Sequence, residues 1–245
     1  MALRFILFDL VGTLLDERSD HEALDAVMKE VVVRYALKEK PGELSGRFAL
    51  ALMGIMEGEP DIAEGADFVP FHEAAPEIFA GLMATLGFSV TVEEKAWFWK
   101  RYLDIQRDEW KPYREARAAL EALHEAGFIL GAVTDADRYL LDDILPRTPL
   151  FGLLPVTVSA EEAGHVKPHP APFRLALERA GCMPGETMMV GDSYERDLVG
   201  AKAAGITEVV LIDRHKARTV DVPTMATLRG LPRHVAARRA AFDAT

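Results

Sequence analysis

The chain has 245 residues, 49% of them hydrophobic, which is enough for one large hydrophobic core and a second, smaller one. Its formal net charge of −11 provides no broad positive field for a phosphate backbone and therefore excludes nucleic acid as the main expected partner. The single cysteine, Cys182, excludes a disulfide framework. The sequence has no apolar run of about 18 residues, which excludes a membrane span. Together these features predict a cytoplasmic protein.

The first predicted element is a buried strand over residues 3–9 that ends at Asp9. Residues 16–110 then show helical patterns and no convincing strand. The last of these patterns begins with Thr91 and Glu94 at the spacing of a capping box. An insertion of this length predicts a separate, all-helical domain over residues 16–110, with helices expected over 21–37, 42–58, 71–87 and 92–108.

From residue 111 onward, short apolar runs alternate with helical patterns that stop at glycine residues. This alternation predicts an α/β fold with a parallel, doubly wound sheet. The core domain is expected over residues 1–15 and 111–230, and the last residues, 231–245, are expected to form a tail or a short helix. The further strands are expected over residues 128–135, 153–160, 187–192 and 207–213.

Polar side chains follow the ends of these strands, where the ligand of an open α/β sheet lies. Two carboxylates can hold Mg²⁺, which prefers hard oxygen ligands, and an ammonium group can neutralise phosphate oxygens. A hydroxyl group and free backbone N–H groups near Gly12 and Thr13 can donate to the same oxygens. Each residue alone is common as a turn, cap or surface residue, so the prediction of phosphoryl transfer depends on their joint spacing. The strand-end residues are Asp9, Thr134, Asp135, Lys167 and Asp192.

Four segments in this order resemble the motifs of the haloacid dehalogenase superfamily: "FDLVGTLLD", "AVTDAD", "HVKPHPAPF" and "VGDSYERDLVGAKAAG". The resemblance covers residues 1–16 and about 111–213. It implies a Rossmann-like core with an inserted helical cap of the C1 type. It also implies that Asp9 is the nucleophile, that Thr134, Lys167 and the groups around Gly12, Thr13 and Asp135 bind phosphate, and that Mg²⁺ is held by Asp9, the carbonyl of Val11 and Asp192, with Asp197 organising the metal site.

The chain departs from the phosphatases of that family at Val11, where they carry a second aspartate. That aspartate protonates the leaving oxygen and then activates the hydrolytic water, a contribution that is typically worth about 10²–10⁴ in rate. The first interpretation is a phosphatase that acts on a small phosphorylated metabolite and uses another acid, such as Asp16, Asp135 or a cap glutamate. Such an enzyme could equally favour leaving groups of low pKa, which need little protonation.

Two other interpretations stay open. Dehalogenases of the family also lack the second aspartate, but they do not use the magnesium pair that Asp192 and Asp197 retain here. Phosphonate hydrolases need a cap lysine, and the helical pattern over residues 42–58 contains none. The third interpretation is a binding or regulatory protein that keeps the phosphate pocket without turnover. The sequence names neither the substrate nor the oligomeric state, for which a monomer and a homodimer are both expected possibilities.

Overall fold

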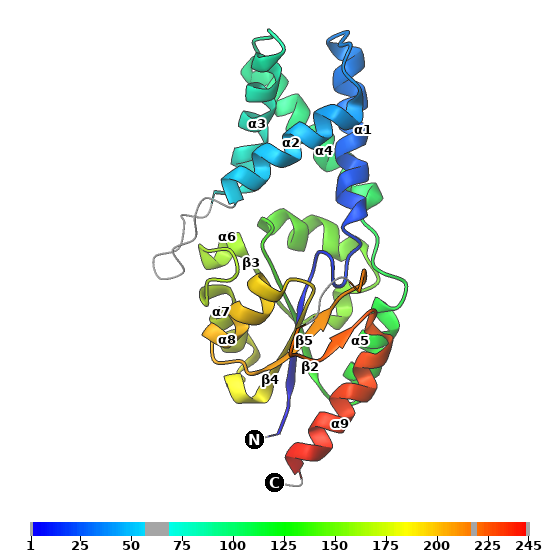
Figure 1. Ribbon diagram of the computed structural model, residues 1–245, viewed down its shortest axis with the longest axis vertical. Coiled ribbons are helices and arrows are strands. Elements are labelled where there is room, and N and C mark those ends of the chain that lie inside the picture. The colour runs from blue at the N-terminus through cyan, green and yellow to red at the C-terminus, as the bar shows by residue number, and fades with distance from the viewer. Residues whose placement is uncertain (1, 57–68, 217–219, 244–245) are drawn as a thin grey trace. The chain divides into compact units, whose positions relative to one another are not determined.

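The computed structural model describes residues 2–56, 69–216 and 220–243 (Figure 1). The chain divides into two compact units. The core unit comprises Met1–Asp16 and Lys111–Thr245, and the cap unit comprises Glu17–Trp110. Within the described residues, no helix combines the length and the apolarity that crossing a lipid bilayer demands.

The core unit is built on a six-stranded sheet in the order β3-β2-β1-β4-β5-β6, and all neighbouring strands are parallel. The predicted α/β class and parallel sheet are therefore confirmed. From β1 the chain adds β2 and then β3 on one side. It then crosses to the other side of β1, where β4, β5 and β6 follow, so the strand order reverses at β1. The strands are β1 (Phe5–Asp9), β2 (Ile129–Thr134), β3 (Val156–Ser159), β4 (Thr187–Gly191), β5 (Glu208–Ile212) and the short β6 (Thr224–Met225), which the sequence did not predict.

Helices cover the sheet from both sides, which explains why its strands are apolar on both faces. In Figure 1, α5 and α9 lie together on one side, and α7 and α8 lie on the other. Phe173 from α7 and Leu198 are packed with Phe5 and Leu7 of β1 in one buried cluster. The C-terminal segment, expected as a tail or a short helix, forms the 13-residue helix α9. The helices of this unit are α5 (Ala116–Glu125), α6 (Ala160–Ala163), α7 (Ala171–Ala180), α8 (Gly200–Ala203) and α9 (Leu231–Asp243).

The cap unit has its own hydrophobic core, and its described elements are all helices, as the patterns predicted. Phe79 and Phe98 stack at its centre, with ring centroids 4.2 Å apart. The predicted capping box is present: the N–H of Glu94 donates to Thr91 Oγ1, and the N–H of Thr91 donates to the Glu94 carboxylate. The helices are α1 (Arg18–Arg34), α2 (Pro41–Met56), α3 (Phe71–Thr85) and α4 (Val92–Glu109).

The two segments of the core unit that adjoin the cap sequence pair with each other. The N–H of Asp16 donates to the carbonyl of Lys111 at 2.9 Å, and the N–H of Tyr113 donates to the carbonyl of Leu14 at 3.0 Å. The segment that follows Asp9 is thus hydrogen-bonded to the segment that leads into α5, and both belong to the same compact unit.

Candidate active site

Asp9 lies at the carboxyl end of β1, the strand beside which the sheet order reverses. Every residue of β1 is buried, and Asp9 itself is only 5% exposed. Removing a carboxylate from water is unfavourable unless partners compensate. Burial raises the pKa of Asp9 well above its usual value, and the neighbouring carboxylates of Asp197 and Asp192 raise it further, while Lys167 lowers it.

Lys167 supplies the main compensation for this buried carboxylate. Its Nζ lies 2.6 Å from Oδ1 of Asp9 and 2.6 Å from Oδ1 of Asp197, and its side chain is 2% exposed. Burial would lower the pKa of Lys167, but the carboxylates of Asp135, Asp197 and Asp9 outweigh burial and raise it. The ammonium group is therefore charged throughout the physiological range and holds Asp9 in a fixed orientation.

Asp192, on the loop after β4, and Asp197, in the π-helix η5 (Tyr194–Val199) that follows, bring two more carboxylates to Asp9. One oxygen from each of the three aspartates lies within 4.8 Å of the others. The N–H of Ser193 donates to Oδ2 of Asp197 at 2.9 Å, so both oxygens of Asp197 already have partners, from Ser193 and Lys167.

The donor set of this cluster fits a hard divalent cation. Oδ2 of Asp9 is buried and accepts no hydrogen bond from the residues that the structure describes. A buried carboxylate oxygen without a donor is costly, and a cation bound among carboxylates would satisfy it. Such a cation would also favour the charged, nucleophilic form of Asp9. Oxygen ligands without a nearby cysteine favour Mg²⁺ over zinc.

Gly12 shapes the turn after Asp9 so that Asp192 can approach it. Gly12 has a φ of +92°, and a Cβ at this position would meet Oδ2 of Asp192 at 2.6 Å, so both backbone and space require glycine. The N–H of Gly12 donates to the carbonyl of Leu15 at 2.8 Å. Gly12 therefore does not offer the free N–H group that the sequence analysis expected, because the tight turn uses that donor itself.

Thr13 keeps more of its predicted capacity. Its hydroxyl group donates to Oδ1 of Asp192 at 3.4 Å, and its backbone N–H has no acceptor among the described residues. The Thr13 N–H is thus one donor in this turn that stays available for a phosphate oxygen. Val11 lies in the same turn and is half-buried, between Asp9 and Gly12.

Thr134 and Asp135, at the end of β2, lie beside β1 in the sheet. Thr134 is buried, and its hydroxyl oxygen accepts from the N–H of Ala136 at 3.2 Å, which leaves the hydroxyl proton available for donation. The carboxylate of Asp135 contacts two basic residues. Its Oδ1 accepts from the N–H of Lys167 at 2.8 Å, and its Oδ2 lies 3.6 Å from Nη1 of Arg196. A carboxylate with these contacts positions the Lys167 loop, and the binding of phosphate by groups around Asp135 stays a prediction.

Arg214, which the sequence analysis missed, holds the turn after Asp9 from the side. Its Nε donates to the carbonyl of Gly12 at 3.1 Å, and its Nη2 donates to the carbonyl of Thr13 at 2.8 Å. Its Nη1 donates to Glu115 at 2.7 Å, and its guanidinium carbon lies 3.3 Å from the centroid of the Tyr113 ring. The sequence offered one indication that Arg214 belongs to the site: it lies just after β5, at the carboxyl edge of the sheet.

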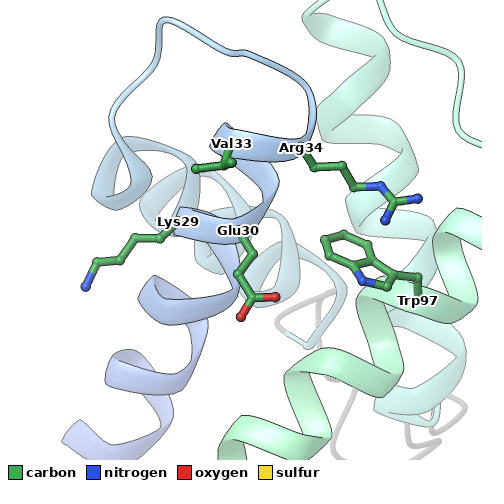
Figure 2. Close-up of a pocket in the computed structure, with 5 residues that line it drawn as sticks. All are labelled: Lys29, Glu30, Val33, Arg34 and Trp97. Atoms are coloured by element: carbon green, nitrogen blue, oxygen red, sulfur yellow. The ribbon is translucent and has the colours of Figure 1, made fainter.

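The cap unit contains a separate pocket of about 400 Å³ between α1 and α4 (Figure 2). The guanidinium of Arg34 extends over the ring of Trp97, 4.4 Å from its centroid. Glu30 is paired with Arg101 at 2.8 Å. Val33 and Lys29 complete the lining, and we assign no chemistry to this pocket.

Comparison with known proteins gives a family for this fold and site. The profile of the haloacid dehalogenase-like hydrolases matches residues 3–205. A phosphoglycolate phosphatase of Xylella fastidiosa is 32% identical over 85% of this chain and 80% of its own length. The pyrophosphatase PpaX of Bacillus velezensis is 30% identical over 82% of this chain and 79% of its own. The crystal structure of L-2-haloacid dehalogenase from Xanthobacter autotrophicus has a TM-score of 0.72 at 19% identity and covers 96% of this chain and 98% of its own, which shows a shared fold alone.

Proposed function

Because the chain belongs to the haloacid dehalogenase-like hydrolase family, we propose that it is a magnesium-dependent phosphatase that forms an aspartyl-phosphate on Asp9. The observation that carries the proposal is the buried pair of Asp9 and Lys167 beside the carboxylates of Asp192 and Asp197. A dehalogenase needs no such cluster of acids, and the two relatives named above are phosphatases in the broad sense. The substrate is a small phosphorylated molecule, and the proposed location is the cytoplasm.

In this proposal, Mg²⁺ held by Asp9, the Val11 carbonyl and Asp192 supplies positive charge against the phosphate oxygens. Lys167 holds Asp9 through Oδ1 and so fixes the orientation of the carboxylate, whose buried Oδ2 accepts no hydrogen bond from the described residues. The hydroxyl of Thr134 and the N–H of Thr13 donate to the phosphoryl oxygens as charge develops on them. Asp9 then attacks phosphorus, the bond to the leaving oxygen breaks, and water later cleaves the aspartyl-phosphate to release orthophosphate.

Val11 restricts which leaving group can depart. A valine cannot protonate the leaving oxygen, and Asp135 is a poor replacement because its carboxylate already contacts Lys167 and Arg196. Leaving groups that depart as stable anions do not need the proton. Phosphoanhydrides and acyl phosphates are of this kind, and in the hydrolysis of pyrophosphate, which the name of the relative PpaX indicates, the leaving group is orthophosphate. We therefore propose substrates with a leaving group of low pKa.

The test is a screen of phosphorylated metabolites for phosphate release with and without Mg²⁺. Asp9→Asn, which keeps the shape of the nucleophile, is the matched inactive control. Asp192→Asn should weaken Mg²⁺ binding, measured by calorimetry, and should remove turnover. Full Mg²⁺-dependent activity in either variant would overturn the proposal. Tight binding of phosphate compounds without any release by the wild type would favour a binding or regulatory protein.

A further inference from the structure

Arg196 lies at the edge of the site, and its side chain has no hydrogen-bond partner among the described residues. It belongs to the π-helix η5 (Tyr194–Val199), which follows directly on the loop of Asp192 and includes Asp197. Its backbone N–H donates to Ser193 Oγ, so the start of the helix is fixed. The Arg196 side chain is 51% exposed, and its guanidinium forms no hydrogen bond with any residue within 2–56, 69–216 or 220–243.

The position of the guanidinium is set by one long ion pair. Nη1 of Arg196 lies 3.6 Å from Oδ2 of Asp135, beyond hydrogen-bonding distance. The other oxygen of Asp135 accepts from the N–H of Lys167, whose ammonium group contacts Asp9. Arg196 is therefore connected to the nucleophile through the carboxylate of Asp135 and through Lys167. The long contact with Asp135 leaves the N–H groups of the guanidinium available to donate hydrogen bonds.

Several carboxylates lie in this part of the site, those of Asp9, Asp135, Asp192 and Asp197, and the buried ammonium of Lys167 contacts two of them. This density of negative charge favours a cation beside Asp135. The guanidinium of Arg196 adds charged donors for an anionic substrate to the neutral donors of Thr13 and Thr134.

We propose that Arg196 binds a second anionic group of the substrate, a phosphate or a carboxylate, carried on the leaving group beside the transferred phosphoryl. A guanidinium binds a carboxylate or a phosphate through two parallel hydrogen bonds, because both groups present two oxygens that share a negative charge. This inference rests on the proposed function, because it names the substrate class of that site. Those substrates in which the second group is a phosphate that itself departs also suit Val11, since a phosphate leaving group departs without protonation.

Binding of non-hydrolysable compounds tests the inference independently of turnover. Calorimetry with Mg²⁺ compares phosphonoacetate and methylenediphosphonate, which carry a second anion, with ethylphosphonate, which does not. The readout is the ratio of the affinity for each doubly anionic compound to the affinity for ethylphosphonate. Arg196→Gln should lower this ratio by about 10-fold or more, and Arg196→Lys should retain part of it because the charge stays while the fork is lost. The two doubly anionic compounds distinguish a carboxylate from a phosphate as the second group.

Two matched variants separate the alternatives. Arg147→Gln removes an equally exposed arginine, which is paired with Asp143 in the same unit, and should leave the ratio unchanged. Asp135→Asn should weaken all three compounds alike, because Asp135 positions the Lys167 loop. An unchanged ratio in Arg196→Gln would overturn the inference, whether binding is retained or is lost equally for all compounds. If the wild type binds the compounds with the expected ratio but hydrolyses nothing, the inference stands and the proposed catalytic function fails.

Discussion

Arg214 donates from Nη2 to the carbonyl oxygen of Thr13 at 2.8 Å, across 201 positions of the sequence. With its second bond to the carbonyl of Gly12, it fixes the turn that contains Val11 from the side of β5. The same guanidinium is paired with Glu115, at the start of α5. One side chain thus connects the loop of the nucleophile to the end of β5 and to the segment that leads into α5.

We expect Arg214→Gln to lower both stability and turnover. The variant loses charge-assisted hydrogen bonds to two carbonyl groups and leaves Glu115 without its cation, so the free energy of unfolding should fall by about 2–3 kcal/mol. A displaced turn should lower kcat by about 10-fold or more, because the Val11 carbonyl and the Thr13 N–H lose their positions. Urea unfolding and phosphate release measure the two effects.

The matched control for that prediction is Arg238→Gln. Arg238 pairs with Glu208 of β5 in the same unit and has no contact with the turn among its described partners. This more exposed pair should contribute at most about 1 kcal/mol, and turnover should stay at the wild-type level. Identical losses of stability and turnover in the two variants would show that Arg214 has no special relation to the site.

The Arg214–Glu115 pair should make stability depend on pH in the acid range. Burial would raise the pKa of Glu115, but the hydrogen bond from Arg214 and bonds from backbone groups lower it below its usual value. A lowered carboxyl pKa in the folded state means that the unfolded state binds the proton more readily. The pair therefore stabilises the fold at pH values above about 4.5, and this contribution is lost as the pH falls through the folded-state pKa.

Glu115→Gln isolates this effect from the titration of other acids. The difference in unfolding free energy between the wild type and the variant should be largest near pH 7 and should shrink below pH of about 4.5. Urea titrations at several pH values measure it. A difference that stays constant down to the lowest pH at which the protein is folded would contradict the role assigned to the charge of Glu115.

The capping box of α4 should stabilise the cap unit without serving the chemistry. Thr91→Ala removes the acceptor of the Glu94 N–H and should cost about 1 kcal/mol in unfolding free energy. Thr91→Ser keeps the hydroxyl oxygen and should retain most of that stability. Thermal unfolding followed by circular dichroism compares the two. Equal losses in both variants would show that packing of the threonine methyl, and not the cap, is what matters.

The sequence was sufficient for the parts of the fold that depend on local pattern. The strand ending at Asp9, the helices of the cap unit and the Thr91 capping box are each encoded within about twenty consecutive residues, where apolar periodicity and cap residues act. The two-residue strand β6 was missed because it has no apolar pattern of its own and exists only through its pairing with β5.

The strand ends also predicted that Asp9, Lys167 and Asp192 would meet, because parallel strands place their carboxyl ends at one edge, and the family resemblance added Asp197. The sequence could not show which hydrogen bonds the neighbouring residues form. The Gly12 N–H is used inside its own turn, and Asp135 is engaged by Lys167. Arg214 acts over more than 200 positions, so no local pattern marks it.

The substitution at Val11 leads to the last prediction. Attack by Asp9 needs a charged, oriented carboxylate and a neutralised phosphate, and Lys167 supports both with a valine at position 11. Expulsion of a poor leaving group and activation of the hydrolytic water do need an acid or base. Val11→Asp should therefore raise the turnover of an alkyl phosphate by on the order of 10²-fold. With p-nitrophenyl phosphate, the rate of aspartyl-phosphate formation should rise much less, because nitrophenolate leaves readily.

The design includes two controls that bear on the same turn. Val11→Asn introduces the shape and polarity of aspartate without an ionisable proton, so it should give no comparable gain. Asp9→Asn should be inactive with both esters. Rapid-quench measurement of the p-nitrophenol burst then separates formation of the aspartyl-phosphate, which releases p-nitrophenol, from its hydrolysis, which releases phosphate. Hydrolysis should be the slower step in the wild type because Val11 cannot activate water. If the wild type already hydrolyses the alkyl ester as fast as Val11→Asp, another residue supplies the proton, and the restriction to leaving groups of low pKa is wrong.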